Sequence, residues 1–206
     1  QPIHPWETFY NFGTADTLVE WCQQNGVKVW GHTLAWHAQT ASWFFQAENP
    51  VTEETTKPPV RQRMVWDPNA PRLSMDEYWR RSIKGEMASR EVALERLEKH
   101  IKTVVGRYKG RIIGWDVFNE SIADSGDCTT ENLRTFSWYQ VTGPDVITLA
   151  FKWAHEADPD AELYYNDYNI EQGAVENKGK HASSMVLLKR LLAVEQCHNL
   201  LALQTH

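Results

Sequence analysis

The sequence predicts an α/β fold built on a parallel sheet. Short apolar, β-rich runs alternate along the 206 residues with longer segments whose apolar residues recur at helical spacing, and this alternation is typical of βαβ units. Strand–helix repeats recur four times, and neither glycine-rich phosphate-binding pattern, GxGxxG or GxxxxGK[ST], occurs in the chain. The missing phosphate loops argue against a nucleotide-binding version of this fold.

The first half of the chain contributes two strands and two helices. Residues 14–24 are predicted to form a helix capped by its first threonine. Residues 27–34 follow an Asn-Gly turn signal and are predicted as the first strand. A longer helix is predicted to begin after Ser89 and to run to Tyr108. Residues 111–119, an apolar run entered through a glycine, are predicted as the second strand.

The second half repeats the pattern. A third helix is predicted to open at residues 142–145, where the proline of Thr-Gly-Pro-Asp suits a first helical turn. Residues 163–167 are predicted as the third strand, 185–196 as a helix and 200–204 as the fourth strand. Each strand is thus separated from the next by a helical segment, as a parallel sheet requires.

One connection is unusually long. Residues 48–88 are polar and proline-rich, and loops beyond about 12–15 residues are commonly functional or disordered. A short helix is predicted within it at 76–84. The segment is interpreted as an insertion, which either extends a ligand cleft through Trp66, Tyr78 or Trp79 or is solvated and has no ligand role.

The composition fits one soluble domain. Apolar residues make up 42% and charged residues 23% of the chain, and the net charge of −6 has no basic stripe of the kind that nucleic-acid binding needs. No apolar run is long enough to span a membrane, and no leader resembles a signal peptide. Three widely spaced cysteines form neither a disulfide framework nor a CxxC site. The ten tryptophans indicate either an aromatic core or a surface on which sugar rings stack.

Polar side chains gather where the predicted strands end. These positions are 32–37, Asn119, Glu120, 166–169 and 204–206. In parallel α/β folds the carboxyl ends of the strands carry the functional site. Carboxylates, amides, imidazoles and indoles together match what glycoside hydrolysis needs, namely an acid, a second carboxylate, hydrogen-bonding groups and stacking surfaces.

Each of these residues also has a structural interpretation. Glu120 could cap the following helix, although a carboxylate directly after a buried strand favours function. His32 and His37 could be structural histidines, and their i, i+5 spacing does not match the helical zinc pattern. Asp167 and Asn169 could form an Asx-turn. The cluster, rather than any single member, indicates a site.

Four segments of the chain resemble the signature segments of the glycoside hydrolase 10 xylanases. They are GHTLAWH at 31–37, WDVFNES at 115–121, LYYNDYN at 163–169 and LQTH at 203–206. The resemblance implies a (β/α)8 TIM barrel, incomplete, in which these segments end strands three to six. It covers residues 1–206 as one partial catalytic barrel, apart from the insertion at about 48–88. It also implies hydrolysis of internal β-1,4 bonds of xylan with retention.

The resemblance assigns residue roles. It implies Glu120 as the general acid/base and six substrate-binding residues, which are His32, Trp36, Asn119, Tyr168, Gln204 and His206. His32 and Trp36 would belong to the glycone side, and His206 would bond to the nucleophile. It implies no metal or other cofactor, xylan or a xylo-oligosaccharide as the partner, no membrane or nucleic-acid partner, a monomer when complete, and secretion or a periplasmic location.

The family's nucleophile segment, T-E-[LI]-D-like, has no counterpart in the sequence. Asp116, Asp167 and Glu171 are the nearby carboxylates, and none matches the position of that nucleophile. The chain is therefore expected to be part of a longer enzyme and inactive alone. Two alternatives stay open: a degenerate or non-catalytic xylan-binding barrel, and another barrel β-glycanase such as a cellulase or mannanase.

Overall fold

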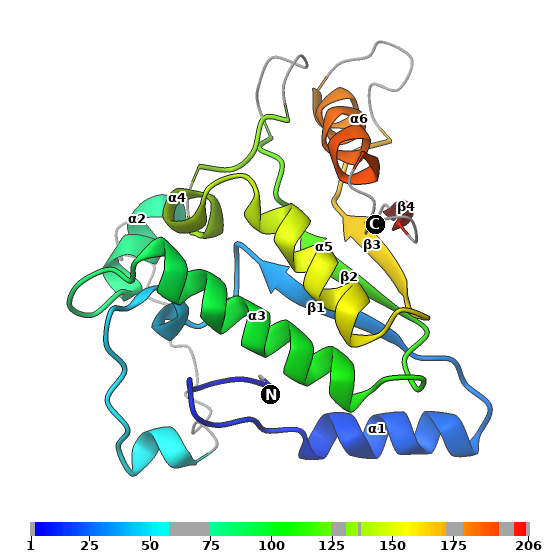
Figure 1. Cartoon of the computed structure of the whole chain (residues 1–206), viewed down its shortest axis with the longest axis horizontal. Helices are drawn as coiled ribbons and strands as arrows, with labels where there is room; N and C mark the ends of the chain where they lie inside the picture. The colour runs from blue at the N-terminus through cyan, green and yellow to red at the C-terminus, as the bar shows by residue number, and fades with distance from the viewer. Residues whose placement is uncertain are drawn as a thin grey trace, which may run out of the picture.

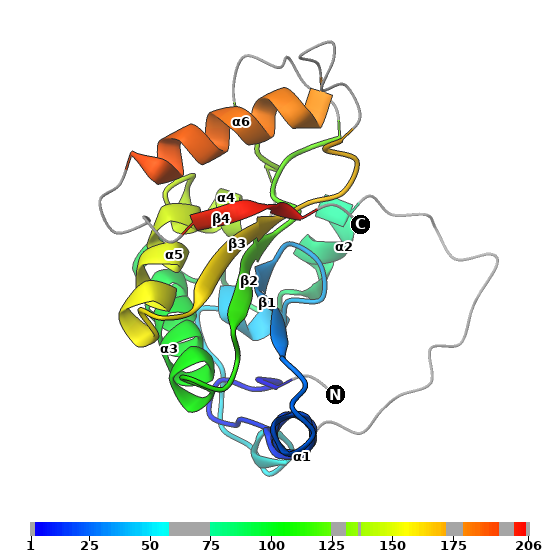
Figure 2. The ribbon, with the colours of Figure 1, turned by 90° about the vertical axis from the view of Figure 1, so that its right-hand side faces the viewer.

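A computed structural model describes residues 3–57, 75–124, 131–135, 137–171, 179–193 and 200–204. Four strands form one sheet in the order β1-β2-β3-β4, and every neighbouring pair is parallel. Figure 2 shows the strands side by side in chain order. Their bounds are Trp30–Trp36 (β1), Gly114–Asn119 (β2), Glu162–Asn166 (β3) and Leu200–Gln204 (β4). The prediction of a parallel α/β sheet in chain order is confirmed.

Helical segments lie before the first strand and between each strand and the next. The α-helices are Gly13–Gln24 (α1), Met75–Ser82 (α2), Arg90–Arg107 (α3), Trp138–Thr142 (α4), Val146–Ala157 (α5) and Gly179–Leu192 (α6). Short 3-10 turns occupy Ser42–Phe45 (η1) and Glu54–Thr56 (η2). Helices α3 and α5 pack against each other and cover the same face of β1 and β2 (Figure 1). Among the described helices, none is long and apolar enough to cross a membrane.

The two helix starts predicted from caps have different outcomes. Ser89 caps α3, because its Oγ accepts a hydrogen bond from the Val92 amide at 3.3 Å. The predicted threonine cap of α1 is wrong. That helix begins one residue earlier, at Gly13, because the Phe12 carbonyl already accepts from the Asp16 amide at 2.8 Å.

The sheet and its covering helices enclose an aromatic-rich core. All six residues of β2 are buried. Buried tryptophans in this core are Trp43, Trp79, Trp115, Trp138 and Trp153. Half of the ten tryptophans are therefore packed in the interior, which favours the core explanation for their number.

Trp79 is one of these core residues. Its ring is 7% exposed and meets Phe45 edge to face, with centroids 5.5 Å apart. It is therefore not accessible for stacking on a ligand. Trp66 and the side chain of Tyr78 lie outside the described part of the chain, so the cleft-extending role of the 48–88 segment stays a prediction for those two residues.

The strands β1 and β2 approach closely at Gly31. A Cβ atom at this position would lie 2.1 Å from the Trp115 ring, far inside van der Waals contact. Glycine is therefore required here for the indole to lie across β1.

Candidate active site

The carboxyl ends of the four strands lie in one row across the sheet. Trp36 pairs with Asn119, Asn119 with Asn166, and Asn166 with Gln204. The sequence predicted this convergence from the ends of apolar runs, and the backbone register brings it about. The side chain of Gln204 and the whole of His206 lie outside the described residues.

Glu120 directly follows β2 and has an unusual backbone. Its φ is +51°, in the left-handed region that few residues other than glycine adopt. Its amide donates to the Asn166 carbonyl at 2.8 Å, and its carbonyl accepts from Arg134 Nε at 2.9 Å. The peptide groups on both sides of Glu120 are thus held, and they fix the direction of a half-buried carboxyl side chain.

Trp36 reaches the Glu120 carboxylate. Its Nε1 donates to Glu120 Oε2 at 3.1 Å. In the amide orientation that satisfies both of its polar atoms, the Asn119 carboxamide oxygen also lies 3.2 Å from Trp36 Nε1. Asn119 is 1% exposed and its amide is 2.7 Å from that of Asn166. One indole N–H therefore ties together the ends of β1 and β2.

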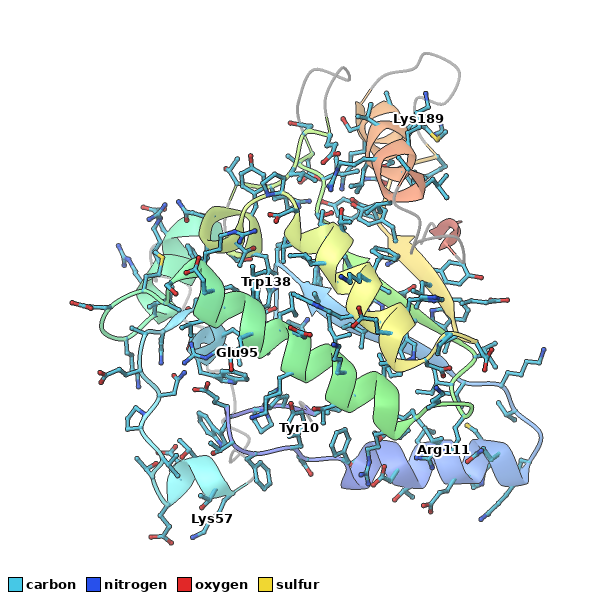
Figure 3. All side chains as sticks on the ribbon, in the orientation of Figure 1. Tyr10, Lys57, Glu95, Arg111, Trp138 and Lys189 are labelled. Atoms are coloured by element: carbon cyan, nitrogen blue, oxygen red, sulfur yellow. The ribbon has the colours of Figure 1, made fainter. Side chains whose placement is uncertain are left out.

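Trp138 supports Trp36 from the helical side. Its Nε1 donates to the Trp36 carbonyl at 3.2 Å, and its ring is 2% exposed. Figure 3 labels Trp138 beside the carboxyl end of β1. The same carbonyl also accepts from the Thr40 hydroxyl. The loop after β1 is thus anchored at the position where the Trp36 side chain turns toward Glu120.

His32 is oriented by a buried carboxylate. Its Nδ1 lies 2.8 Å from Asp116 Oδ2, and Trp30 Nε1 donates to Asp116 Oδ1 at 3.1 Å. Asp116 is 2% exposed, whereas the His32 side chain is 47% exposed. A carboxylate can only accept, so Nδ1 carries the proton and Nε2 is directed away from Asp116. His32 and Trp36 both line a cavity of about 650 Å³.

His37 is a neutral ring at neutral pH. Burial, followed by the charge of Arg134, lowers its pKa to about 4, against a smaller opposing contribution from a hydrogen bond with the Glu120 backbone. An uncharged imidazole at this position favours a structural contribution over a charge-bearing one, in line with the structural interpretation of its sequence context.

Asp167 follows β3 and is fully engaged. It is 1% exposed. One oxygen accepts from the Tyr165 hydroxyl at 2.6 Å. The other accepts from the Tyr168 amide at 2.8 Å and from Lys180 Nζ at 2.7 Å. The side chain therefore organises the loop after β3, although its backbone contact is with the next residue and not with the amide two residues on that an Asx-turn uses.

Tyr168 lies in a charged network beside Glu120. Its hydroxyl accepts from Arg134 Nη2 at 2.9 Å and donates to Asp124. Lys180 Nζ lies 3.4 Å from the centre of its ring. Burial acts to raise the pKa of Asp124, but hydrogen bonds from Tyr168 and Lys180 and the charge of Arg134 together lower it to about 2. The Asp124 carboxylate therefore stays ionised through the neutral range.

Several of these residues are not evident from the sequence. Asp116 had one signal, since a carboxylate in the middle of a buried apolar strand demands a partner, although from the sequence it was named only as a nearby carboxylate that does not match the position of the nucleophile. Asp124, Arg134 and Lys180 lie in loops or at a helix start, where no periodicity marks them. Within the ranges that the structure describes, no group of three or more His, Cys, Asp or Glu side chains is placed to hold a metal ion.

Comparisons with a family model and with known proteins agree on one family. The family model described as "Glycosyl hydrolase family 10" matches residues 1–206. Endo-1,4-beta-xylanase A of Xylanibacter ruminicola is 37% identical over 204 residues, covering 99% of this chain and 43% of that protein. Endo-1,4-beta-xylanase A of a Caldicellulosiruptor species is 40% identical over 171 residues, covering 83% of this chain and 20% of that protein.

Solved structures agree with the sequence relatives. Xylanase 10B of Thermotoga maritima superposes with a TM-score of 0.71 at 33% identity, covering 98% of this chain and 47% of that one. TsXylA of Thermoanaerobacterium saccharolyticum, described as an intracellular xylanase and solved with xylotetraose, gives a TM-score of 0.67 at 36% identity, covering 93% and 48%. The chain thus spans less than half the length of these relatives, and the expectation of an incomplete (β/α)8 barrel is confirmed.

The expectation of a secreted or periplasmic protein is wrong. It was drawn from resemblance alone, and TsXylA, which is similar over most of this chain, is an intracellular xylanase. Resemblance to this group of enzymes therefore does not imply export.

Proposed function

The chain belongs to glycosyl hydrolase family 10, and on this premise we propose that it carries the general acid/base and part of the cleft of a retaining endo-1,4-β-xylanase. The proposal concerns residues 1–206 as a portion of a longer catalytic barrel. One observation carries it. The Glu120 carboxyl group follows a buried parallel strand, is held by Trp36 Nε1 at 3.1 Å, and has both adjoining peptide groups hydrogen-bonded.

This arrangement suits proton transfer to a glycosidic oxygen. The Trp36 bond occupies Oε2, so the transferable proton is expected on Oε1. As the bond to the leaving sugar breaks, that proton passes to the departing oxygen. The same carboxylate then removes a proton from the water that hydrolyses the intermediate, as retention requires.

Retention also requires a nucleophilic carboxylate about 5–5.5 Å from the acid/base. Asp116 and Asp167 are unsuited, because their oxygens already accept hydrogen bonds from buried or nearby donors. Glu171 is exposed in the loop after β3. We infer that residues 1–206 contribute the acid/base and not the nucleophile, and that a polypeptide restricted to them has no xylanase turnover.

The proposed sugar contacts come from the strand ends. His32 would bind through Nε2, because Nδ1 is engaged by Asp116, and Trp36 would contribute its indole face. Asn119 would offer its amide to the hydroxyl next to the scissile bond. Tyr168, Gln204 and His206 complete the proposed set, as the resemblance implies. Xylan or a xylo-oligosaccharide is the proposed substrate, in keeping with the xylo-oligosaccharide complex of TsXylA.

Glu120→Gln tests the proposal in a polypeptide that spans the whole barrel. Glutamine keeps the shape but cannot donate the catalytic proton, so turnover of xylan should fall by about 10²–10⁴-fold. The loss should be smaller on aryl xylosides, whose leaving groups need little protonation. Glu95→Gln on the outer face of α3 (Figure 3) is a matched control and should keep normal turnover. Undiminished xylan turnover by Glu120→Gln would contradict the assignment.

The same assay separates the alternatives. Reducing-sugar release from xylan, but not from cellulose or mannan, is the expected result for the wild-type barrel. Release from cellulose or mannan instead would indicate another β-glycanase. Binding of xylan without any release would indicate a non-catalytic barrel.

A further inference from the structure

Arg134 contacts both loops that flank the acid/base. Its Nε donates to the Glu120 carbonyl at 2.9 Å. Its Nη2 donates to the Tyr168 hydroxyl at 2.9 Å, and both terminal nitrogens lie 3.2–3.3 Å from the Asp124 carboxylate. The side chain is 12% exposed. One rigid guanidinium therefore joins the peptide after β2 to the loop after β3.

The contact with Glu120 is made at the peptide carbonyl, not at the carboxylate. Glu120 holds a left-handed backbone conformation, with φ +51°, and such a conformation persists when its surroundings fix it. Arg134 and the Asn166 carbonyl supply hydrogen bonds on the two sides of that residue. Arg134 thus helps to set where the carboxyl side chain points.

The contact with Tyr168 decides how that residue can meet a ligand. Its single hydroxyl hydrogen is donated to Asp124, and its oxygen already accepts from Arg134. The ammonium group of Lys180 lies 3.4 Å from the ring centre and covers one face. The opposite ring face is what remains for a sugar. The hydroxyl therefore serves to hold the ring in place, and the face away from Lys180 is the part of this half-buried residue that a stacking sugar would use.

We propose that Arg134 is a positioning residue that couples the Glu120 acid/base to Tyr168 as a platform for a xylose ring on the β3 side of the site. This inference rests on the proposed function, because it assumes a xylan chain passing Glu120. The ligand class is a pyranose whose apolar face stacks on the Tyr168 ring. Lys180 and Asp124 complete the clamp that holds that ring, through Asp167 and the Tyr168 hydroxyl respectively.

A double-mutant cycle in the whole barrel tests the coupling. The variants are Arg134→Met, Tyr168→Phe and the pair, assayed on xylohexaose and on nitrophenyl β-xylobioside. Each single change removes the partly buried hydrogen bond between the Arg134 guanidinium and the Tyr168 hydroxyl, so kcat/KM on xylohexaose should fall on the order of 10-fold. The double variant should be no worse than Arg134→Met, because both changes release the same ring.

Two controls separate positioning from loss of folding. Arg111→Met removes a guanidinium at the opposite end of the sheet (Figure 3), where it bonds to the Arg107 carbonyl, and should match the wild type. Arg134→Lys keeps a charge facing Asp124 but not the forked donor geometry, and should show the same loss with a near-wild-type melting temperature. The loss should be smaller on the nitrophenyl substrate, because nitrophenol leaves without a xylose ring stacked on Tyr168. A fall in the folded fraction would instead lower the rates on both substrates equally.

Independent, multiplicative losses in the double variant would overturn the proposal, since the Tyr168 hydroxyl would then act on the substrate without Arg134. Arg134→Met behaving like Arg111→Met would also overturn it. The proposed function fails separately, if the wild-type barrel releases no sugar from xylan. A wild type that cuts xylan and an uncoupled pair would therefore refute only the role of Arg134.

Discussion

Replacing Asp116 by asparagine should reverse the tautomer of His32. The Asp116 carboxylate accepts from Trp30 Nε1 at 3.1 Å and from His32 Nδ1 at 2.8 Å. Asparagine has one carboxamide oxygen, and the indole can only donate, so that oxygen must stay toward Trp30. The amide NH2 would then face Nδ1. Two opposed donors are avoided if the imidazole moves its proton to Nε2 and accepts at Nδ1.

The energetic cost follows from the two bonds. Each changes from a charge-assisted hydrogen bond to a neutral one, a loss of about 1 kcal/mol apiece. The sum of about 2 kcal/mol should lower the melting temperature by roughly 4–8 °C for a chain of this size. Asp160→Asn is a matched control, because it removes the same charge from an exposed position before β3.

Two-bond proton–nitrogen correlation spectra report the tautomer directly. The His32 resonance can be assigned by its absence in His32→Gln, and spectra are compared at a pH where the ring is neutral. The wild type should show a protonated Nδ1, and Asp116→Asn a protonated Nε2. Retention of the Nδ1 proton in Asp116→Asn, with a melting temperature equal to that of Asp160→Asn, would refute the claim that Asp116 orients this ring.

Two further predictions concern stability. Gly31→Ala should destabilise the fold by about 1–3 kcal/mol, because its Cβ would lie 2.1 Å from the Trp115 ring. Urea unfolding measures this loss, and the control Gly106→Ala, whose Cβ meets nothing within 4 Å, should be neutral or stabilising. Equal urea midpoints for the two variants would contradict the close approach at Gly31. The ring of His4 is buried and that of His100 is half-buried, and their Nδ1 atoms lie 3.0 Å apart; desolvation above all lowers their pKa values to about 4 and about 3. Both folded pKa values lie below the unfolded value of about 6.5, so stability should be full above pH 6.5 and fall by up to about 1.4 kcal/mol per pH unit for each ring as the pH drops toward 4. His4→Gln should make that fall shallower, and parallel urea midpoints between pH 7 and pH 5 would argue against the pair.

The existence of the strands was predictable because apolar runs mark them. The residues at which the strands begin and end were predicted less well. Residues 27–34 and 111–119 were predicted, whereas β1 is Trp30–Trp36 and β2 is Gly114–Asn119. Pairing begins where Trp30 meets Gly114, and that register depends on both strands. An apolar run in one segment cannot specify where its neighbour starts.

Helix α6 shows a different limit. It was predicted at 185–196 from its leucines, yet it begins at Gly179. Its first turns carry Lys180 and Ser184, which are buried and donate hydrogen bonds to the Asp167 carboxylate and the Lys180 carbonyl respectively. Polar residues buried by hydrogen bonds are invisible to hydrophobic periodicity. For the same reason, the sequence pattern did not predict the part of the site that Lys180 helps to hold.

The core of the candidate site was predictable because it needs only the sheet. Glu120 and Asn119 end one strand and Trp36 ends the neighbouring one, and parallel strands bring their ends together. The Arg134 contacts could not be predicted. They require two loops of particular conformation and a side chain long enough to join them, and no pattern of residue types encodes that meeting.

The left-handed backbone of Glu120 sets stability against function at a single residue. A side chain at φ +51° costs about 1–2 kcal/mol relative to glycine, so glycine at this position would relax the peptide while removing the carboxyl group. Selection for thermal robustness alone would drive the residue toward glycine or asparagine. Designers who stabilise this barrel by consensus or energy ranking should therefore hold position 120 fixed, because the substitution that looks most favourable to the backbone is the one that would eliminate the proposed proton donor.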